Sequence, residues 1–191
     1  MDLDGTYDVY PLSEGSETYK IGVYENLQDD QYAAAFTQSV NVTLKDEYSM
    51  FLYPNAYVNF NSASNAVKKG QELAESANSD IDVVQNVYHY IINNIDYDYD
   101  KAETVQSGYI PDVDDTLASG TGICFDYASL TASMLRSQGI PTKIIFGYVA
   151  PNDIYHAWNM FYTEQTGWVT VSFEVRADTW NRLDLTFAAG G

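Results

Sequence analysis

The chain has 191 residues, which suits a single domain with a sizeable core, and 46% of them are hydrophobic. Its 27 acidic residues outnumber 9 basic ones and give a formal net charge of −18, so the surface repels nucleic-acid backbones and anionic lipid headgroups. A single cysteine excludes an internal disulfide and a cysteine-cluster metal site, and no stretch is long and apolar enough to insert into a membrane as a helix.

The N-terminus says little about the compartment. Residues 1–17 are polar and predict a poorly ordered leader, without the basic and apolar regions of a signal peptide. Acidic, tyrosine-rich, cysteine-poor domains are common outside the bacterial cell. We therefore expect an extracytoplasmic protein, secreted or at the cell surface, whose export signal is missing from this sequence.

The first half of the chain divides into a strand-rich and a helical part. From residue 19 to residue 60, alternation of apolar and polar residues predicts strands, with a helical alternative left open over 30–36. Apolar residues at helical spacing predict helices over 61–77 and 80–95, the second with Asp80 as its N-cap. The acidic segment 96–122 predicts a long polar loop of the kind that is usually functional. We place a leader and β-rich extension in 1–60 and a second domain in 61–191.

The second half begins at the cysteine. Residues 124–138 predict a helix that Gly139 ends and that Pro141 prevents from continuing. Strands are predicted over 143–149, 156–162, 168–175 and 180–187. Helices followed by a run of strands indicate an α+β fold rather than an alternating parallel sheet.

Cys124 is a candidate nucleophile because of its position. Gly120 and Gly122 precede it, and a helix is predicted to begin at it. The free N–H groups and positive dipole end of a helix stabilise a thiolate, so we expect a depressed pKa for Cys124 and backbone donors for an oxyanion. The alternative is a buried cysteine that acts as a small hydrophobic residue.

The chain has two histidines, and they differ in context. His89 lies in the amphipathic helix without a polar cluster around it, which favours a surface or core-margin role. His156 begins a predicted strand beside a loop, where a sheet can aim an imidazole at a partner. Alternation along that strand places Trp158 on the same face as His156, where its ring could shield a thiolate–imidazolium pair from water.

The other N–H of a catalytic imidazole needs an acceptor. Asp184 qualifies as an isolated carboxylate in a mostly apolar predicted strand. Glu174, on the preceding predicted strand, is the competing candidate.

Six short motifs follow one another in the second half of the chain: GICFDYA (122–128), LRSQGIP (135–141), GY (147–148), HAW (156–158), GW (167–168) and DLT (184–186). In this order they resemble the transglutaminase-like superfamily of papain-fold enzymes. The resemblance runs from about residue 95 to residue 187, or about half of the chain, and the order Cys, His, Asp is that of the family. The sequence departs from the family pattern at two positions. Leu185 replaces the Pro that commonly follows the aspartate, and Asn159 replaces the acidic residue that often follows His-Ala-Trp.

The resemblance implies a papain-like core in 61–191, with a catalytic helix packed on an antiparallel sheet. It implies that Cys124 attacks an amide or acyl carbon, that His156 moves the proton, and that Asp184 fixes the tautomer of the imidazole. Tyr97 and Trp158 are the expected substrate-binding residues, and Tyr97 or its neighbour Tyr99 could stabilise an oxyanion.

The function expected from this resemblance is amide acyl transfer on proteins or peptides through a thioester, as in a transglutaminase, protease or amidase. Water is the default acceptor, because favouring an amine requires a site that excludes water. The alternative is a non-catalytic cell-surface binding module that keeps the same cleft, and residues 1–60 could be a separate docking element.

The aspartates between residues 96 and 115 suggest Ca²⁺, which animal members of the family use. Their spacing does not match an EF-hand loop, which needs a Gly and a closing Glu at set positions. We expect a solvated acidic loop and neither metal nor other cofactor. Ca²⁺ dependence, the natural substrate and the oligomeric state stay open.

Overall fold

The computed structural model describes residues 9–149 and 154–171. Residues 11–50 form a compact unit of their own, separate from the rest of the chain. The boundary expected at residue 60 stays a prediction.

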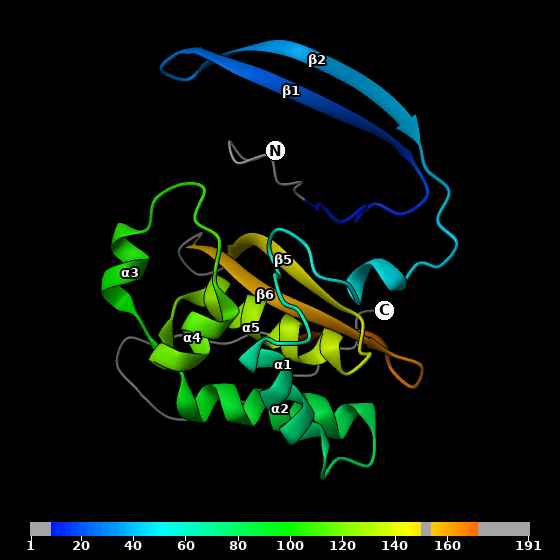
Figure 1. The fold of residues 1–191 in the computed structure, drawn as a ribbon, viewed down its shortest axis with the longest axis vertical. Coiled ribbons are helices and arrows are strands. Elements are labelled where there is room, and N and C mark those ends of the chain that lie inside the picture. Colours follow the sequence, from blue (N-terminus) through cyan, green and yellow to red (C-terminus); the bar gives the residue numbers. More distant parts are fainter. Residues whose placement is uncertain (1–8, 150–153, 172–191) are drawn as a thin grey trace. The chain divides into compact units, whose positions relative to one another are not determined.

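The smaller unit is built around an antiparallel hairpin of β1 (Thr18–Gln28) and β2 (Gln31–Asn41) (Figure 1). The turn uses Asp29 at a φ of 49°, and its carbonyl accepts a hydrogen bond from the Asn26 side chain at 2.7 Å. The strands predicted over 19–60 are confirmed as far as Asn41, and residues 42–60 contain an isolated bridge between Asn55 and Val58 but no strand. The helical alternative over 30–36 is wrong, because β2 runs from Gln31 to Asn41. A short 3-10 helix, η1 (Ser49–Phe51), follows.

The larger unit packs helices against a three-stranded antiparallel sheet. The sheet has the order β5 (Thr142–Val149), β6 (Ile154–Thr163), β7 (Gly167–Val171). One helix, α5 (Cys124–Ser137), contacts the sheet as well as α1 (Asn65–Ala74) and α2 (Asp80–Asn94) (Figure 1). This is the α+β arrangement that the sequence predicts.

The core of this unit surrounds α5. Its side chains Leu130 and Met134 are fully buried against residues from α2 and from the sheet, among them Ile91 and Phe161. At 25 cal/mol per Å² of apolar surface, each such side chain contributes roughly 1.5–3 kcal/mol on burial. The helix that begins at Cys124 is therefore held in place by the hydrophobic core.

Two of the local predictions are wrong. Segment 96–122 is not a loop: it contains β3 (Asp96–Tyr97), α3 (Tyr99–Thr104), α4 (Val113–Ser119) and β4 (Thr121–Gly122). The N-cap of α2 is Ser79, not Asp80, and its side chain accepts from the N–H of Asp82.

The acidic residues of segment 96–122 explain why it folds. Asp98 is the N-cap of α3 and accepts from the Lys101 N–H at 2.8 Å, while Asp112 is the N-cap of α4 and accepts from the N–H of Asp114 at 2.9 Å. Carboxylates at these positions satisfy N–H groups that have no acceptor within the helix. A polar composition that suggests a loop therefore stabilises two short helices.

Candidate active site

Cys124 is the first residue of α5, after the extended N-cap residue Ile123. The thiol is half-buried and receives hydrogen bonds from the backbone at Phe125, in its own first turn, and at Ala157 on β6. Ala157 directly follows His156. The fold thus brings the start of α5 to the predicted imidazole-bearing part of β6, 33 residues further along the chain.

The electrostatics of the thiol differ from the expectation. Burial raises the pKa of Cys124, and this outweighs the hydrogen bonds from the backbone at Ala157 and Phe125, which lower it; the Asp126 carboxylate raises it further. The expected depression is therefore wrong in its net direction. The helix N-terminus does supply stabilising donors, but the loss of solvent has the larger effect.

Two glycines position the cysteine for different reasons. Gly120 ends α4 with a φ of 66°, in the left-handed region, where a side chain would be strained. At Gly122 the cause is space, because a Cβ there would lie 2.6 Å from the Cβ of Asp126. The Gly-x-Gly-x-Cys pattern thus combines a helix end with a close approach to the next helix.

Tyr97 lies beside the cysteine. Its strand β3 pairs in parallel with β4, with Tyr97 opposite Gly122, and Asp98 N–H donates to the Gly122 carbonyl at 3.0 Å. Burial, followed by the negative charge at Cys124, raises the pKa of Tyr97 to about 12. Its hydroxyl therefore keeps its proton at neutral pH and can donate a hydrogen bond.

His156 and Trp158 lie on one face of β6, as predicted. Their rings stack with centroids 6.2 Å apart and planes inclined by 19°. His156 faces Gly147 of β5 across the ladder, and a Cβ at Gly147 would approach the Trp158 indole to 3.0 Å. The glycine of the Gly-Tyr motif leaves room for the indole.

The opposite face of β6 packs on α5. Ala157, Asn159 and Phe161 are buried there, and the Asn159 amide donates to the carbonyls of Ala128 at 3.0 Å and Lys143 at 3.2 Å. Asn159 therefore links α5, the helix that begins at Cys124, to the sheet. The departure from the family pattern at this position therefore has a structural role, because the amide joins α5 to β5 and β6.

Asp184 and its competitor Glu174 fall outside the described residues. His89 is exposed on α2, as expected for a surface role. A direct bond between the Cys124 thiol and the His156 imidazole, and the role of Asp184, stay predictions.

Three residues connected to the cysteine were not predicted from the sequence: Asp126, near the thiol, and Lys101 and Tyr109, which bind Asp126. Asp126 is completely buried in the first turn of α5, and its carboxylate binds both Lys101 and Tyr109. The signal available in the sequence was an acidic residue at the third position of a helix, where its carboxylate can accept a hydrogen bond from the N–H of the N-cap residue. Nothing in the sequence indicates its two long-range partners.

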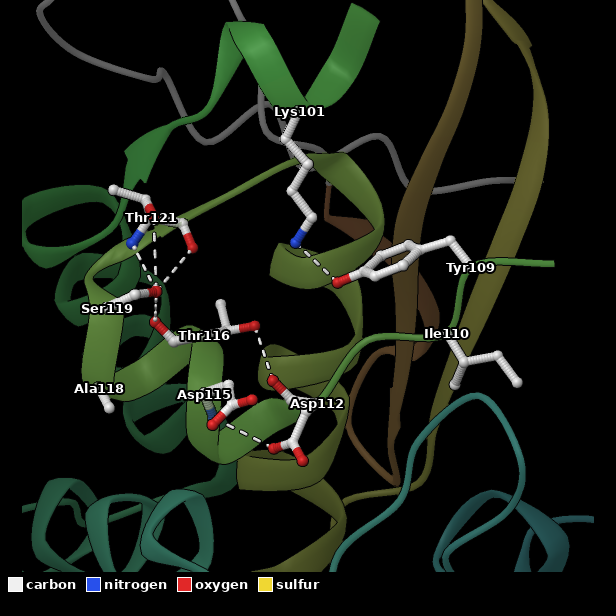
Figure 2. Close-up of a pocket in the computed structure, with 9 residues that line it drawn as sticks. All are labelled: Lys101, Tyr109, Ile110, Asp112, Asp115, Thr116, Ala118, Ser119 and Thr121. Atoms are coloured by element: carbon white, nitrogen blue, oxygen red, sulfur yellow. Dashed lines mark hydrogen bonds between the residues drawn. The ribbon is translucent and has the colours of Figure 1, made fainter. Parts of the chain in front are cut away.

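A pocket of about 720 Å³ lies on the Lys101 and Tyr109 side of this cluster (Figure 2). Hydroxyls of Thr116, Ser119 and Thr121 line it, together with Asp112 and Asp115. Asp112 is already engaged as the α4 cap. Within residues 9–149 and 154–171, no three His, Cys, Asp or Glu side chains are grouped to hold a metal ion, and no helix is long and apolar enough to cross a membrane.

Comparison with solved structures shows the same fold. A proposed cysteine protease from Cytophaga hutchinsonii has a TM-score of 0.55 at 21% identity, over 68% of this chain and 42% of its own. The periplasmic domain of TgpA from Pseudomonas aeruginosa, bound to ethylmercury, has a TM-score of 0.51 at 22% identity, over 65% of this chain and 47% of its own. A structure described as a TGase has a TM-score of 0.51 at 16% identity, over 87% of this chain and 47% of its own.

Curated relatives match over shorter stretches. The UPF0252 protein MJ1282 of Methanocaldococcus jannaschii is 34% identical over 62 residues, or 30% of this chain and 18% of its own. The protein ML0607 of Mycobacterium leprae, whose function is uncharacterized, is 28% identical over 127 residues, or 66% of this chain and 43% of its own. The chain thus spans less than half the length of these relatives. The model of the transglutaminase-like superfamily matches residues 67–173, which is more than half of the chain, and the chain belongs to that superfamily.

Proposed function

We propose that the chain is a cysteine acyl-transfer enzyme that acts on amide groups of proteins or peptides. The observation that carries the proposal is the position of Cys124. Its thiol lies at the N-terminus of α5 and meets β6 at Ala157, directly beside His156.

In the proposed reaction the thiol of Cys124 attacks the amide carbonyl carbon while His156 takes the thiol proton. The tetrahedral oxyanion is stabilised by N–H groups of the first turn of α5 and by the Tyr97 hydroxyl. His156 then protonates the leaving amine, the C–N bond breaks and a thioester to Cys124 remains. Water or an amine attacks the thioester, gives its proton to His156 and restores the thiol. Asp184 orients the imidazole.

The raised pKa of Cys124 bears on the timing of this proton transfer. A half-buried thiol of this kind is neutral in the free protein at pH 7, so His156 removes the proton as the substrate is attacked. This is general-base catalysis rather than use of a preformed ion pair.

The same pKa favours a second candidate, a binding module without catalysis. A neutral thiol is a weak nucleophile, and a chain that only binds a polypeptide needs no proton transfer. In that case Cys124 contributes packing at the start of α5.

One assay separates the two. The protein is incubated with a glutamine-containing peptide and a labelled primary amine, and mass spectrometry follows the products. Amine incorporation identifies a transglutaminase, release of ammonia alone an amidase, and backbone cleavage a protease. The proposal expects turnover that Cys124→Ala and His156→Ala each abolish and that His89→Ala leaves unchanged, since His89 is exposed on α2. Turnover that survives Cys124→Ala contradicts the proposal.

We also propose an extracytoplasmic location. It is supported by the acidic composition and by the fold shared with the periplasmic domain of TgpA. Neutral or basic polypeptides are the substrates that a chain with a formal net charge of −18 attracts or tolerates.

A further inference from the structure

The carboxylate of Asp126 is the most enclosed charged group beside the thiol. The residue has a relative exposure of 0%. Its Oδ2 accepts hydrogen bonds from the Ile123 N–H and from the Lys101 Nζ, both at 2.8 Å, and its Oδ1 accepts from the Tyr109 hydroxyl. A buried carboxylate is tolerated only when its lone pairs are satisfied in this way.

The partners come from separate parts of the chain. Lys101 lies on α3, and Tyr109 lies in the connection between α3 and α4. The Lys101 Nζ also donates to the Tyr109 hydroxyl at 2.7 Å and lies 4.5 Å from the centre of its ring (Figure 2). The three side chains therefore form a closed triangle that links α3 and the connection after it to the first turn of α5.

These three side chains affect both the backbone next to Cys124 and the charge near its thiol. Through its hydrogen bond from the Ile123 N–H, Asp126 fixes the backbone directly before the cysteine, in the way the acidic residue of a capping box binds the N-cap N–H. Its negative charge also disfavours the thiolate and disfavours ionisation of Tyr97, while Lys101 supplies the compensating positive charge.

Two charged or titratable side chains are coupled to the thiol: Asp126 on its own helix and Tyr97 on β3. His156 lies on β6 next to Ala157, whose backbone contacts the thiol. Lys101 and Tyr109 reach it through Asp126. Among these, Lys101 is the group whose removal changes the charge beside Asp126 without touching the nucleophile, the base or the hydroxyl donor.

We propose that Lys101, Asp126 and Tyr109 are a positioning network that holds the first turn of α5 and sets the net charge that the Cys124 thiolate meets. The link to catalysis rests on the proposed function. The effect on the thiol itself does not, because alkylation needs no substrate. In this network Asp126 holds the backbone at Ile123, Lys101 neutralises the Asp126 carboxylate, and Tyr109 donates the third hydrogen bond to that carboxylate.

The test is the rate of Cys124 alkylation by iodoacetamide at pH 8, measured by mass spectrometry on the full chain. Lys101→Met leaves the Asp126 charge uncompensated and is expected to slow alkylation about tenfold, which corresponds to one unit in the thiol pKa. Asp126→Asn removes the negative charge, leaves Lys101 in place and is expected to speed alkylation by a similar factor. The double variant is expected to return close to the original rate.

Opposite changes of the alkylation rate in Lys101→Met and Asp126→Asn are a result that a purely structural role does not produce. Loosening of the first turn would expose the thiol and move both single variants in the same direction, toward the rate of a free thiol. Lys69→Met is the matched control, because Lys69 is ion-paired with Glu72 on α1 and its loss should leave the rate unchanged. Shifts of equal sign, or no shift in Lys101→Met, overturn the proposal.

Milder variants keep the test decisive if Lys101→Met does not fold. Lys101→Arg retains the charge and should keep the rate within about twofold, and Tyr109→Phe removes one donor from Asp126 and should slow alkylation about two- to threefold. Far-ultraviolet circular dichroism checks the fold of each variant. Opposite shifts in alkylation without any amide turnover would support the network and contradict the proposed function. Amide turnover with unshifted alkylation would do the reverse.

Discussion

Asp114, on α4, caps a different helix: its carboxylate accepts a hydrogen bond from the backbone N–H of Ala66 at the start of α1, at 2.8 Å. The second oxygen accepts from the N–H of Asn65 at 3.0 Å. Ser64 holds the N-cap position of α1 but makes no side-chain capping bond there. A carboxylate from 48 residues away performs that role, so α1 and α4 are fixed to each other just before the chain turns into β4 and Cys124.

Asp114→Ala is therefore expected to destabilise the protein. Loss of both bonds leaves two N–H groups of α1 without their acceptor, and loss of a helix cap costs about 1 kcal/mol in the free energy of unfolding, with an upper range near 2. Urea denaturation measures the change. Asp115→Ala is the matched control, because it removes the same charge from an exposed neighbour on the same helix and should stay within about 0.5 kcal/mol. Equal losses in both variants would show that charge, not capping, is responsible.

This contact marks the limit of what the sequence could predict. The helices now seen at 65–74, 80–94 and 124–137 and the sheet strands were predicted, because the periodicity of their apolar residues reflects burial on one face. The hairpin strands were predicted from the alternation of apolar and polar residues, although most of their side chains are exposed. The short helices α3 and α4 were missed, because their stability comes from aspartate caps in a segment whose composition suggests a loop. The partner of Asp114 is distant in sequence, and no local pattern could reveal it.

The candidate active site was also predicted only in part. The positions of Cys124 at a helix start and of Trp158 beside His156 follow from capping and strand alternation, and both were predicted. The direction of the thiol pKa was not, because burial depends on what the completed fold packs around the helix tip. Asp126 and its partners were missed for the same reason.

Gly122→Ala tests the close approach between β4, which contains Gly122, and the first turn of α5. The added methyl group would lie 2.6 Å from the Cβ of Asp126, so the first turn of α5 must shift. Overpacking of this kind costs about 1–3 kcal/mol in the free energy of unfolding, and the rate of Cys124 alkylation should change with it. Both quantities are measured on the same preparation.

Gly139→Ala provides the comparison for that variant. Gly139 lies just after the other end of α5, with a φ of 82° and open space around it. Its substitution should cost roughly 1–2 kcal/mol of backbone strain and leave the alkylation rate unchanged. An unchanged rate in Gly122→Ala as well would mean that the glycine does not control the position of the cysteine.

The pH dependence of Cys124 alkylation follows from the raised pKa. The ordinary thiol value used for comparison is 9.0, and burial moves the folded-state pKa above it. The folded protein then keeps the thiol proton where the unfolded chain has lost it, so this group's contribution to stability is complete below pH 9.0 and falls as pH rises through the folded pKa.

The alkylation rate of the free protein should accordingly continue to rise above pH 9.0, whereas N-acetylcysteine under the same conditions should level off earlier. Rates measured between about pH 6 and pH 10.5 cover the relevant range. A plateau reached by pH 7 that disappears in His156→Ala would indicate a preformed thiolate–imidazolium pair and contradict the general-base timing proposed above.

Tyr97 and Tyr99 offer a matched pair for testing the oxyanion donor. Both belong to the segment before the cysteine, and their rings are in contact, with centroids 5.0 Å apart. Tyr97 is paired opposite Gly122, and burial, followed by the negative charge at Cys124, raises its pKa to about 12. Tyr99 is 41% exposed at the start of α3.

Tyr97→Phe should therefore lower kcat by about 100-fold or more, the loss found when one oxyanion donor is removed, with little change in KM. Tyr99→Phe removes the same hydroxyl from a more exposed ring and should leave kcat within about twofold. Because the Tyr97 hydroxyl keeps its proton up to about pH 12, the ratio between the original protein and Tyr97→Phe should stay constant from pH 6 to pH 9. A ratio that changes across that range would mean that Tyr97 acts by exchanging a proton, and equal losses in the two variants would mean that the aromatic pair acts only through packing.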